Sequence, residues 1–139
     1  MIDLPKGWYT STPEALQGVT QLCYTTEINQ QNVAHFAFPI ELDLCYKWRM
    51  YDQDPGPMPR WPHLLLCVSS FDQWSRHRTE GYGCVALPTL PGQSTVTVHT
   101  WRPQHNRTSD LRRFFIGGSP ELESIDLACV PNGHTVGVF

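Results

Sequence analysis

The sequence lacks the features that mark several large classes of protein. Its longest apolar run, HLLLCVSSF from His63, is too short to cross a bilayer, and its start, MIDLPKGWYT, has no basic stretch followed by a hydrophobic one. A formal net charge of -3 over 139 residues gives no large positive field, so binding to nucleic acid through bulk electrostatics is not expected. We therefore expect a cytoplasmic protein with no nucleic-acid partner.

Patterns typical of catalytic and metal-binding sites are also missing. No two of the six histidines have the spacing of a zinc-binding helix, and no two cysteines form a C-x-x-C pair. The acidic residues are scattered, so no paired-acid site is visible. The GYG at 81–83 leads into a predicted strand and not into the helix that a phosphate-binding glycine pattern needs. We predict no enzyme activity, no catalytic residue and no cofactor.

One loop offers a partial exception to the absence of metal ligands. Asp52 and Asp54 lie in YDQDPG with one residue between them, and carboxylate oxygens are calcium ligands. Two acids are too few for a tight site, and the prolines around them add no side-chain ligand. We therefore predict no metal site and keep this pair as weak calcium candidates.

The five cysteines are an odd number and are widely spaced, at Cys23, Cys45, Cys67, Cys84 and Cys129. Each lies among apolar or β-branched neighbours, and none begins a predicted helix, as an activated thiolate often does. In a reducing compartment such residues are most simply small core side chains, and we expect them to be free thiols.

The patterns that are present indicate a β protein of a single domain. In IELDLCYKWRM the residues alternate between two faces, which is typical of a half-buried strand, and one face holds Ile40, Leu42, Leu44, Tyr46, Trp48 and Met50. Further predicted strands are VTQLCYTTE with its hairpin partner VAHFAF, then HLLLCVSSF, GYGCVALP, STVTVHTW, IDLACV and HTVGVF. Many short strands at hairpin spacing predict an antiparallel sandwich or barrel.

The segment DLRRFFIGGSPELE interrupts this pattern with a short amphipathic helix. Leu111, Phe114 and Phe115 have the spacing that places them on one side, and we expect that side to be buried. A helix this short is not stable alone, so it should cover an end or edge of the sandwich. Arg112 and Arg113 point away from that side, and a covering role is favoured over a ligand-binding role for them.

Together, EGYGCVALPTLPGQSTVTVHTWRP and DLRRFFIGGSPELE resemble the B9 domain family, with support from SSFDQW, LQGVTQLC and VAHFAFPIEL. The resemblance covers about 4–127. It implies a C2-like antiparallel β-sandwich of eight strands, so we expect 1–139 to form one B9 domain. Strands of the complete sandwich are then expected before Met1 and after Phe139.

The resemblance also implies a function. The family has three B9-domain proteins, which associate with one another at the ciliary transition zone and basal body, in an assembly that supports cilium formation and restricts the entry of membrane proteins. By resemblance the chain is a non-enzymatic scaffold module, located in the cytoplasm at the cytoskeleton, the centrosome and the base of the cilium. Its expected partners are other B9-domain proteins and members of the transition-zone complex.

Two surfaces are candidates for binding. The first is a partner-binding patch of Trp101, Arg102, Arg112 and Arg113, because the strand ending at Trp101 leads directly toward the helix and because Arg and Trp dominate interface energies.

The second is a lipid-headgroup site of Lys47, Arg49 and Arg60 near the proline-rich loop YDQDPGPMPRWP, where Lys47 and Arg49 share the polar face of one strand. A solvated strand face is the favoured alternative for this set. A third interpretation, a hydrolase or sugar-binding sandwich, requires Trp61 or Trp74 to be exposed beside a pocket that also holds an acid.

Overall fold

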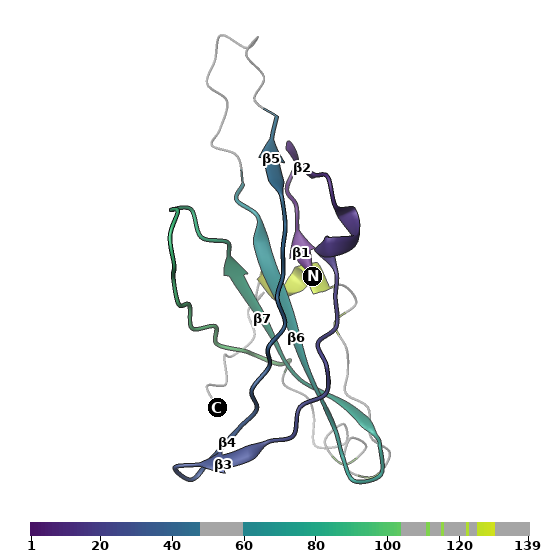
Figure 1. Cartoon of the computed structure of the whole chain (residues 1–139). Coiled ribbons are helices and arrows are strands. Elements are labelled where there is room, and N and C mark those ends of the chain that lie inside the picture. Colours follow the sequence, from purple (N-terminus) through teal and green to yellow (C-terminus); the bar gives the residue numbers. More distant parts are fainter. Residues whose placement is uncertain (48–59, 104–110, 112–114, 116–121, 123–124, 130–139) are drawn as a thin grey trace.

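The computed structural model describes residues 1–47, 60–103, 111, 115, 122 and 125–129 (Figure 1). These residues form short strands and two 3₁₀ helices. In chain order the elements are β1 (Ile2–Asp3), β2 (Trp8–Thr10), η1 (Pro13–Leu16), β3 (Thr26–Ile28), β4 (Gln31–Val33), β5 (Leu44–Tyr46), β6 (His63–Phe71), β7 (His77–Ala86) and η2 (Ile125–Cys129).

The longest strands, β6 and β7, form an antiparallel hairpin that β1 extends into a three-stranded sheet, in the order β1-β6-β7. His63 pairs with Ala86 at one end and Phe71 with His77 at the other, with a shift in register after Val68. HLLLCVSSF was predicted as a strand and is one throughout. The all-β class with antiparallel pairing is thereby confirmed.

Two smaller antiparallel pairs complete the strand inventory of the described residues. β3 and β4 form a hairpin, but a much shorter one than the predicted pair VTQLCYTTE and VAHFAF: of those residues only Thr26, Glu27 and Val33 are in strands. The two turn residues, Asn29 and Gln30, have φ of 52° and 64°. Positive φ at both positions is the type I′ turn that fits the twist of a two-residue hairpin. β2 pairs with β5. Of residues 40–47, the described part of the long strand predicted over 40–50, only Leu44–Tyr46 is a strand, because β2 offers three pairing residues.

The strand predicted for STVTVHTW is absent. One isolated bridge joins Trp101 to Tyr82 of β7, through backbone bonds of 2.7 and 2.8 Å. The segment before Trp101 instead lies close over two glycines of β7: a Cβ on Gly81 would come within 3.0 Å of Thr100, and one on Gly83 within 3.0 Å of Val98. The period-2 pattern was correct about an extended chain, but it could not show whether a neighbour would pair with it.

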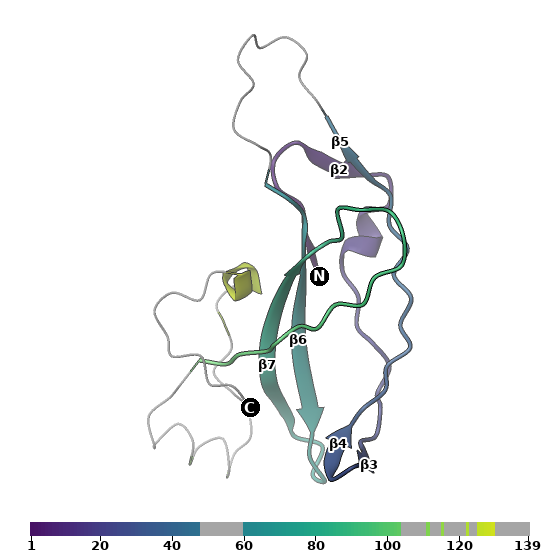
Figure 2. The ribbon, with the colours of Figure 1, turned by 90° about the vertical axis from the view of Figure 1, so that its left-hand side faces the viewer.

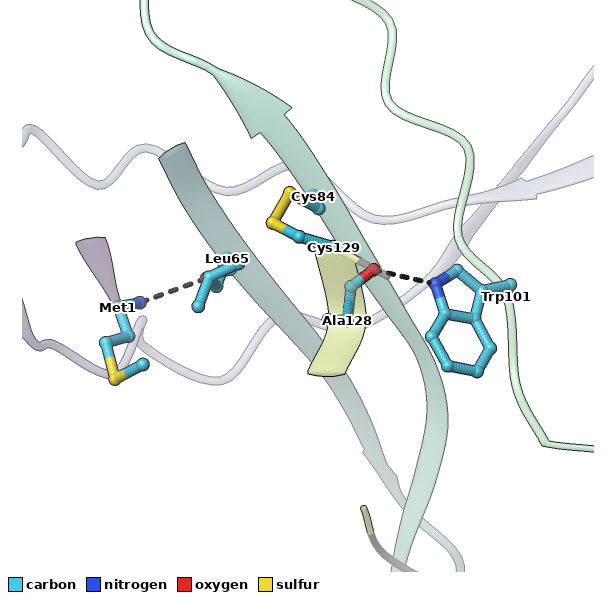
Figure 3. Close-up of a disulfide and its surroundings, with 6 residues drawn as sticks. All are labelled: Met1, Leu65, Cys84, Trp101, Ala128 and Cys129. Carbon is cyan, nitrogen blue, oxygen red and sulfur yellow. Dashed lines mark hydrogen bonds between the residues drawn. A yellow bond between two sulfur atoms is a disulfide. The ribbon is translucent and has the colours of Figure 1, made fainter. Parts of the chain in front are cut away.

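The core lies where η2 packs on the β6–β7 sheet (Figure 3). Its most buried members are Leu65, Tyr82 and Ala128, at 1%, 4% and 2% exposure. Met1 joins β6 here, since its amino group donates to the Leu65 carbonyl at 3.0 Å and its carbonyl accepts from the Leu65 N–H at 2.8 Å. Burial lowers the pKa of this amino group. The indole N–H of Trp101 donates to the Ala128 carbonyl at 3.1 Å.

A disulfide joins Cys84 of β7 to Cys129 of η2 (Figure 3). This corrects the expectation of five free thiols in the core. Cys23, Cys45 and Cys67 are free thiols, but Cys45 and Cys67 are exposed and Cys23 is only partly buried, so the core position predicted for them is wrong. Wide spacing in sequence did not predict the pair, because 45 residues separate two positions that the fold brings to a Cα–Cα distance of 5.2 Å. The bridge fixes η2 to the sheet.

Two other predictions for the C-terminal part need correction. IDLACV was predicted as a strand, but its residues 125–129 form the 3₁₀ helix η2. Leu111 and Phe115 have helical backbone, as predicted, yet they are 59% and 71% exposed, so the side expected to be buried faces solvent in this part. Phe114 lies outside the described residues.

The molecule is elongated, with β2 and β5 near one end and the β3–β4 and β6–β7 turns near the other (Figures 1 and 2). Between them, the segments on either side of β3–β4 run along the outside as extended chain. Among the residues that the structure describes, no helix is long and apolar enough to span a membrane.

Candidate interaction surfaces

The predicted partner-binding patch is built on the bridge between β7 and Trp101. Trp101 is half-buried: its backbone pairs with Tyr82 and its indole with Ala128, so it positions the chain that follows. Arg102 is next, with its Nη1 4.0 Å from Oε2 of Glu80. Glu80 in turn accepts from the Ser70 hydroxyl at 2.7 Å. A polar row thus crosses from β6 over β7 to Arg102. Arg112 and Arg113 lie outside the described residues, so the full patch stays a prediction.

The predicted lipid-headgroup residues flank the segment 48–59. The backbone N–H of Lys47 donates to the Gly7 carbonyl at 2.9 Å, and the Trp8 indole donates to the Arg60 carbonyl at 3.0 Å. The backbones of Lys47 and Arg60 are therefore held to the consecutive residues Gly7 and Trp8, where β2 begins. Arg49, like the calcium candidates Asp52 and Asp54, is outside the described residues.

An aromatic cluster of Trp8, Tyr46 and Trp61 lies beside these two backbone contacts. The Trp8 ring lies 5.3 Å from Tyr46 and 4.9 Å from Trp61, in tilted and edge-on contacts that aromatic pairs favour. The Trp61 indole donates to the Leu87 carbonyl at 2.8 Å. Gly7 has φ of 97°, and a Cβ there would lie 2.8 Å from the Tyr46 ring, so glycine is required for this approach. Trp61 is thus a packing residue and not an exposed sugar platform.

Sequence reasoning missed a third surface, at the turn that joins β6 to β7. We call it the hairpin-tip hollow: an open cavity of about 630 Å³ lined by Asp72, Gln73, Trp74, Arg76, Arg78 and Phe115. Five of these residues come from one short stretch, SSFDQWSRHR, in which aromatic and arginine side chains are dense. This local density of aromatic and arginine residues could have indicated an interaction surface. It could not have indicated that Phe115, from a distant part of the chain, completes the hollow.

Asp72 organises the hollow. Its Oδ1 accepts from the backbone N–H groups of Trp74 and Arg76, both at 2.9 Å, and closes the turn. Its Oδ2 accepts from Arg76 Nε at 2.6 Å and from Arg78 Nη2 at 3.2 Å. Desolvation acts to raise the pKa of Asp72, but these hydrogen bonds and the Arg76 charge outweigh it and hold the pKa below its usual value.

The two arginines hold the walls of the hollow in place. The Arg76 guanidinium lies 4.8 Å from the centre of the Trp74 ring, and its Nη1 donates to the Phe115 carbonyl at 2.9 Å. Trp74 is 75% exposed. An exposed tryptophan beside an acid meets the condition set for a hydrolase or sugar site. Asp72 is nevertheless an ionised carboxylate occupied by four donors, which does not suit a general acid.

Within the described residues, no three His, Cys, Asp or Glu side chains are grouped so that they could hold a metal ion. Surfaces rich in Trp, Arg and Phe, carried on an antiparallel β fold, are typical of a protein-interaction module.

Comparison with known proteins supports that class. A model of the family described as "Ciliary basal body-associated, B9 protein" matches residues 1–136. The chain is 42% identical over 132 residues to "Tectonic-like complex member MKS1" of Homo sapiens and equally to that of Mus musculus, covering 94% of this chain. It is 33% identical over 113 residues to "B9 domain-containing protein 2" of Danio rerio, covering 77% of this chain and 58% of that protein.

The chain belongs to the B9 family, as the resemblance in its sequence predicted. It spans about a quarter of the length of its MKS1 relatives, at 23% of each. No solved structure matches it significantly.

Proposed function

We propose that this chain is a non-enzymatic scaffold module that assembles with other B9-domain proteins at the ciliary transition zone and basal body. There it supports cilium assembly and gating, from the cytoplasmic side and close to the centrosome and cytoskeleton. The observation that carries the proposal is the 42% identity over nearly the whole chain to proteins named as members of a tectonic-like complex. Residues 1–139 act in this proposal as one B9 domain.

Size-exclusion chromatography of the purified chain with the two other B9-domain proteins tests the assembly. We expect one shared peak, with circular dichroism showing a folded chain. Replacing Arg102, Arg112 and Arg113 by Glu reverses the charge of the predicted patch and should weaken the complex without unfolding the chain. A folded wild-type chain that elutes alone contradicts the assembly, whereas normal binding by the folded triple variant contradicts only the patch.

A second function, docking on anionic phosphoinositide membranes without calcium, is favoured by one specific observation. The backbone of Lys47 is hydrogen-bonded to Gly7 and that of Arg60 to Trp8, and this proximity of two basic residues supports the proposal. Each basic residue near an anionic surface contributes about 1 kcal/mol. Flotation with phosphoinositide vesicles should fall for Lys47→Glu combined with Arg60→Glu and stay unchanged on adding EDTA. Flotation that is equal with neutral vesicles contradicts this function.

A further inference from the structure

The hairpin-tip hollow shares no residue with either predicted site. We propose that it docks an acidic segment of a partner B9-domain protein, in which a carboxylate side chain stands beside an apolar one. The proposal rests on the assembly function proposed above and names a surface for it. Three properties of the hollow carry the inference: its fixed geometry, its exposed aromatic walls and its excess of positive charge.

The hollow is ordered before anything binds. Two backbone N–H groups donate to one oxygen of Asp72, and Ser75 of the same turn donates its N–H to the Asp72 carbonyl at 2.9 Å. The Arg76 guanidinium is held from three directions, by the Asp72 carboxylate, the Phe115 carbonyl and the face of Trp74. Side chains that are already ordered lose little entropy on association, which favours binding.

The walls of the hollow are apolar and open to solvent. Trp74 and Phe115 are 75% and 71% exposed although each is held beside an arginine. Phe71, at the end of β6, is 55% exposed and stacks edge-on against His77 at 5.5 Å. Large rings fixed in exposed positions are the residues that most often dominate interface energies, so an apolar side chain of the partner belongs between Trp74 and Phe115.

The charge of the hollow indicates that the partner segment carries an acidic side chain. Of the described residues that line the hollow, two are arginines, Arg76 and Arg78, and one is an acid, Asp72, which pairs with both. Within the described residues, Nε of Arg78 is a buried donor with no hydrogen-bond acceptor. The described lining therefore carries one more positive than negative charge, on a chain whose net charge is -3. A carboxylate of the partner complements that excess and can pair with a guanidinium.

The test measures the affinity of the full chain for each of the two other B9-domain proteins, by calorimetry or by surface binding. We expect Trp74→Ala to weaken the complex about tenfold or more, as loss of a central tryptophan anchor does. Arg78→Gln should also weaken it, and raising the salt concentration should weaken the wild-type complex more than that of Arg78→Gln. Leu90→Ala is the matched control, because Leu90 is 81% exposed on a loop far from the hairpin tip.

The outcomes separate this inference from the function on which it rests. If the wild-type chain and a folded Trp74→Ala variant bind equally well, the hollow is not the docking site, and the assembly function stands. If the wild-type chain binds neither protein, both are overturned. If Trp74→Ala instead abolishes binding to vesicles of phosphatidylcholine and phosphatidylserine while protein binding is unchanged, the hollow meets a membrane and this inference is wrong.

Discussion

Two regions of this molecule are built from equally apolar sequence, yet they differ in what they bury. The sheet of β6 and β7 is paired along its length, carries η2 on one face and buries Leu65 almost completely. The extended chain around β3 and β4 leaves Val19, Leu22 and Tyr24 at 91%, 81% and 95% exposure. One region therefore supplies stability, and the other supplies apolar surface.

The difference follows from where the long-range contacts lie. Cys84–Cys129, the Trp101 bridge and the Met1–Leu65 hydrogen bonds all converge on the same part of β6 and β7. Around β3 and β4, side-chain thiol and amide groups donate hydrogen bonds to backbone carbonyls, for example from Cys23 Sγ to the His35 carbonyl at 3.0 Å. Isolated two-stranded ribbons are marginally stable, so apolar residues alone do not make this region a core.

The largest expected effect is the removal of a core side chain. Leu65→Ala should lower the free energy of unfolding by about 2–5 kcal/mol, the usual cost of leaving a buried cavity. Leu22→Ala, the same change on an exposed site, should shift it by less than about 0.5 kcal/mol. Urea denaturation followed by circular dichroism gives both values, and similar losses for the two variants would remove the distinction between the regions.

Breaking the disulfide should have the next largest effect. Cys84→Ser combined with Cys129→Ser should destabilise the chain by about 2–4 kcal/mol, because the bridge closes a long loop of the unfolded chain. Cys45→Ser is the control, since Cys45 is an exposed free thiol. Thiol titration of the denatured chain should find three free cysteines without reductant and five with it. Disulfides are rare in the cytosol, so finding five without reductant would favour the original expectation of free thiols.

Glycine replacement compares the packing of the two regions at a smaller scale. In Gly83→Ala the new methyl meets Val98 at 3.0 Å beside the core, and overpacking of this kind costs about 1–3 kcal/mol. In Gly18→Ala it meets the tip of the Phe38 ring at 3.2 Å, and Phe38 is 42% exposed and can turn away. Thermal denaturation should therefore show a lower Tm for Gly83→Ala alone. A larger loss for Gly18→Ala would show that the β3–β4 region is the better packed.

The smallest effect concerns Asp72 and pH. Because its pKa is lower in the folded chain than in the unfolded one, Asp72 contributes stability above its unfolded pKa of about 4, and that contribution is lost as the pH falls through the lower, folded value. Asp72→Asn should therefore reduce Tm slightly at pH 7 and flatten its decrease toward pH 3. Asp43→Asn, at an exposed acid near β5, serves as the control. Parallel pH profiles for Asp72→Asn and the wild type would contradict the role of Asp72 in closing the turn.

Local pattern predicted those parts of the fold that depend on neighbours in sequence. The strand at His63–Phe71 was evident, since an apolar run acts within a few residues. The alternation in STVTVHTW and IDLACV was equally clear, but neither became a strand. A strand forms only where the edge of another strand lies alongside it in a suitable register, and a local sequence pattern contains no information about that neighbour.

The same limit applies to the candidate sites. Lys47 and Arg60 were chosen for their proximity to a proline-rich loop, and the structure places both beside β2. Trp101 was chosen as a contact residue, and it is half-buried against Ala128. Trp74 was considered as an exposed residue beside a pocket, but the hairpin-tip hollow itself was not foreseen, because Phe115 reaches it from a distant part of the chain.

The sequence alone determined the family and the all-β class, because both follow from the identity of the residues and from patterns within a few positions. The Cys84–Cys129 bridge, the burial of Leu65 beneath η2 and the exposure of Trp74 were decided by tertiary structure alone. The physical reason is that burial and cross-linking depend on distances between residues tens of positions apart. The chain sets those distances only when the whole sheet forms.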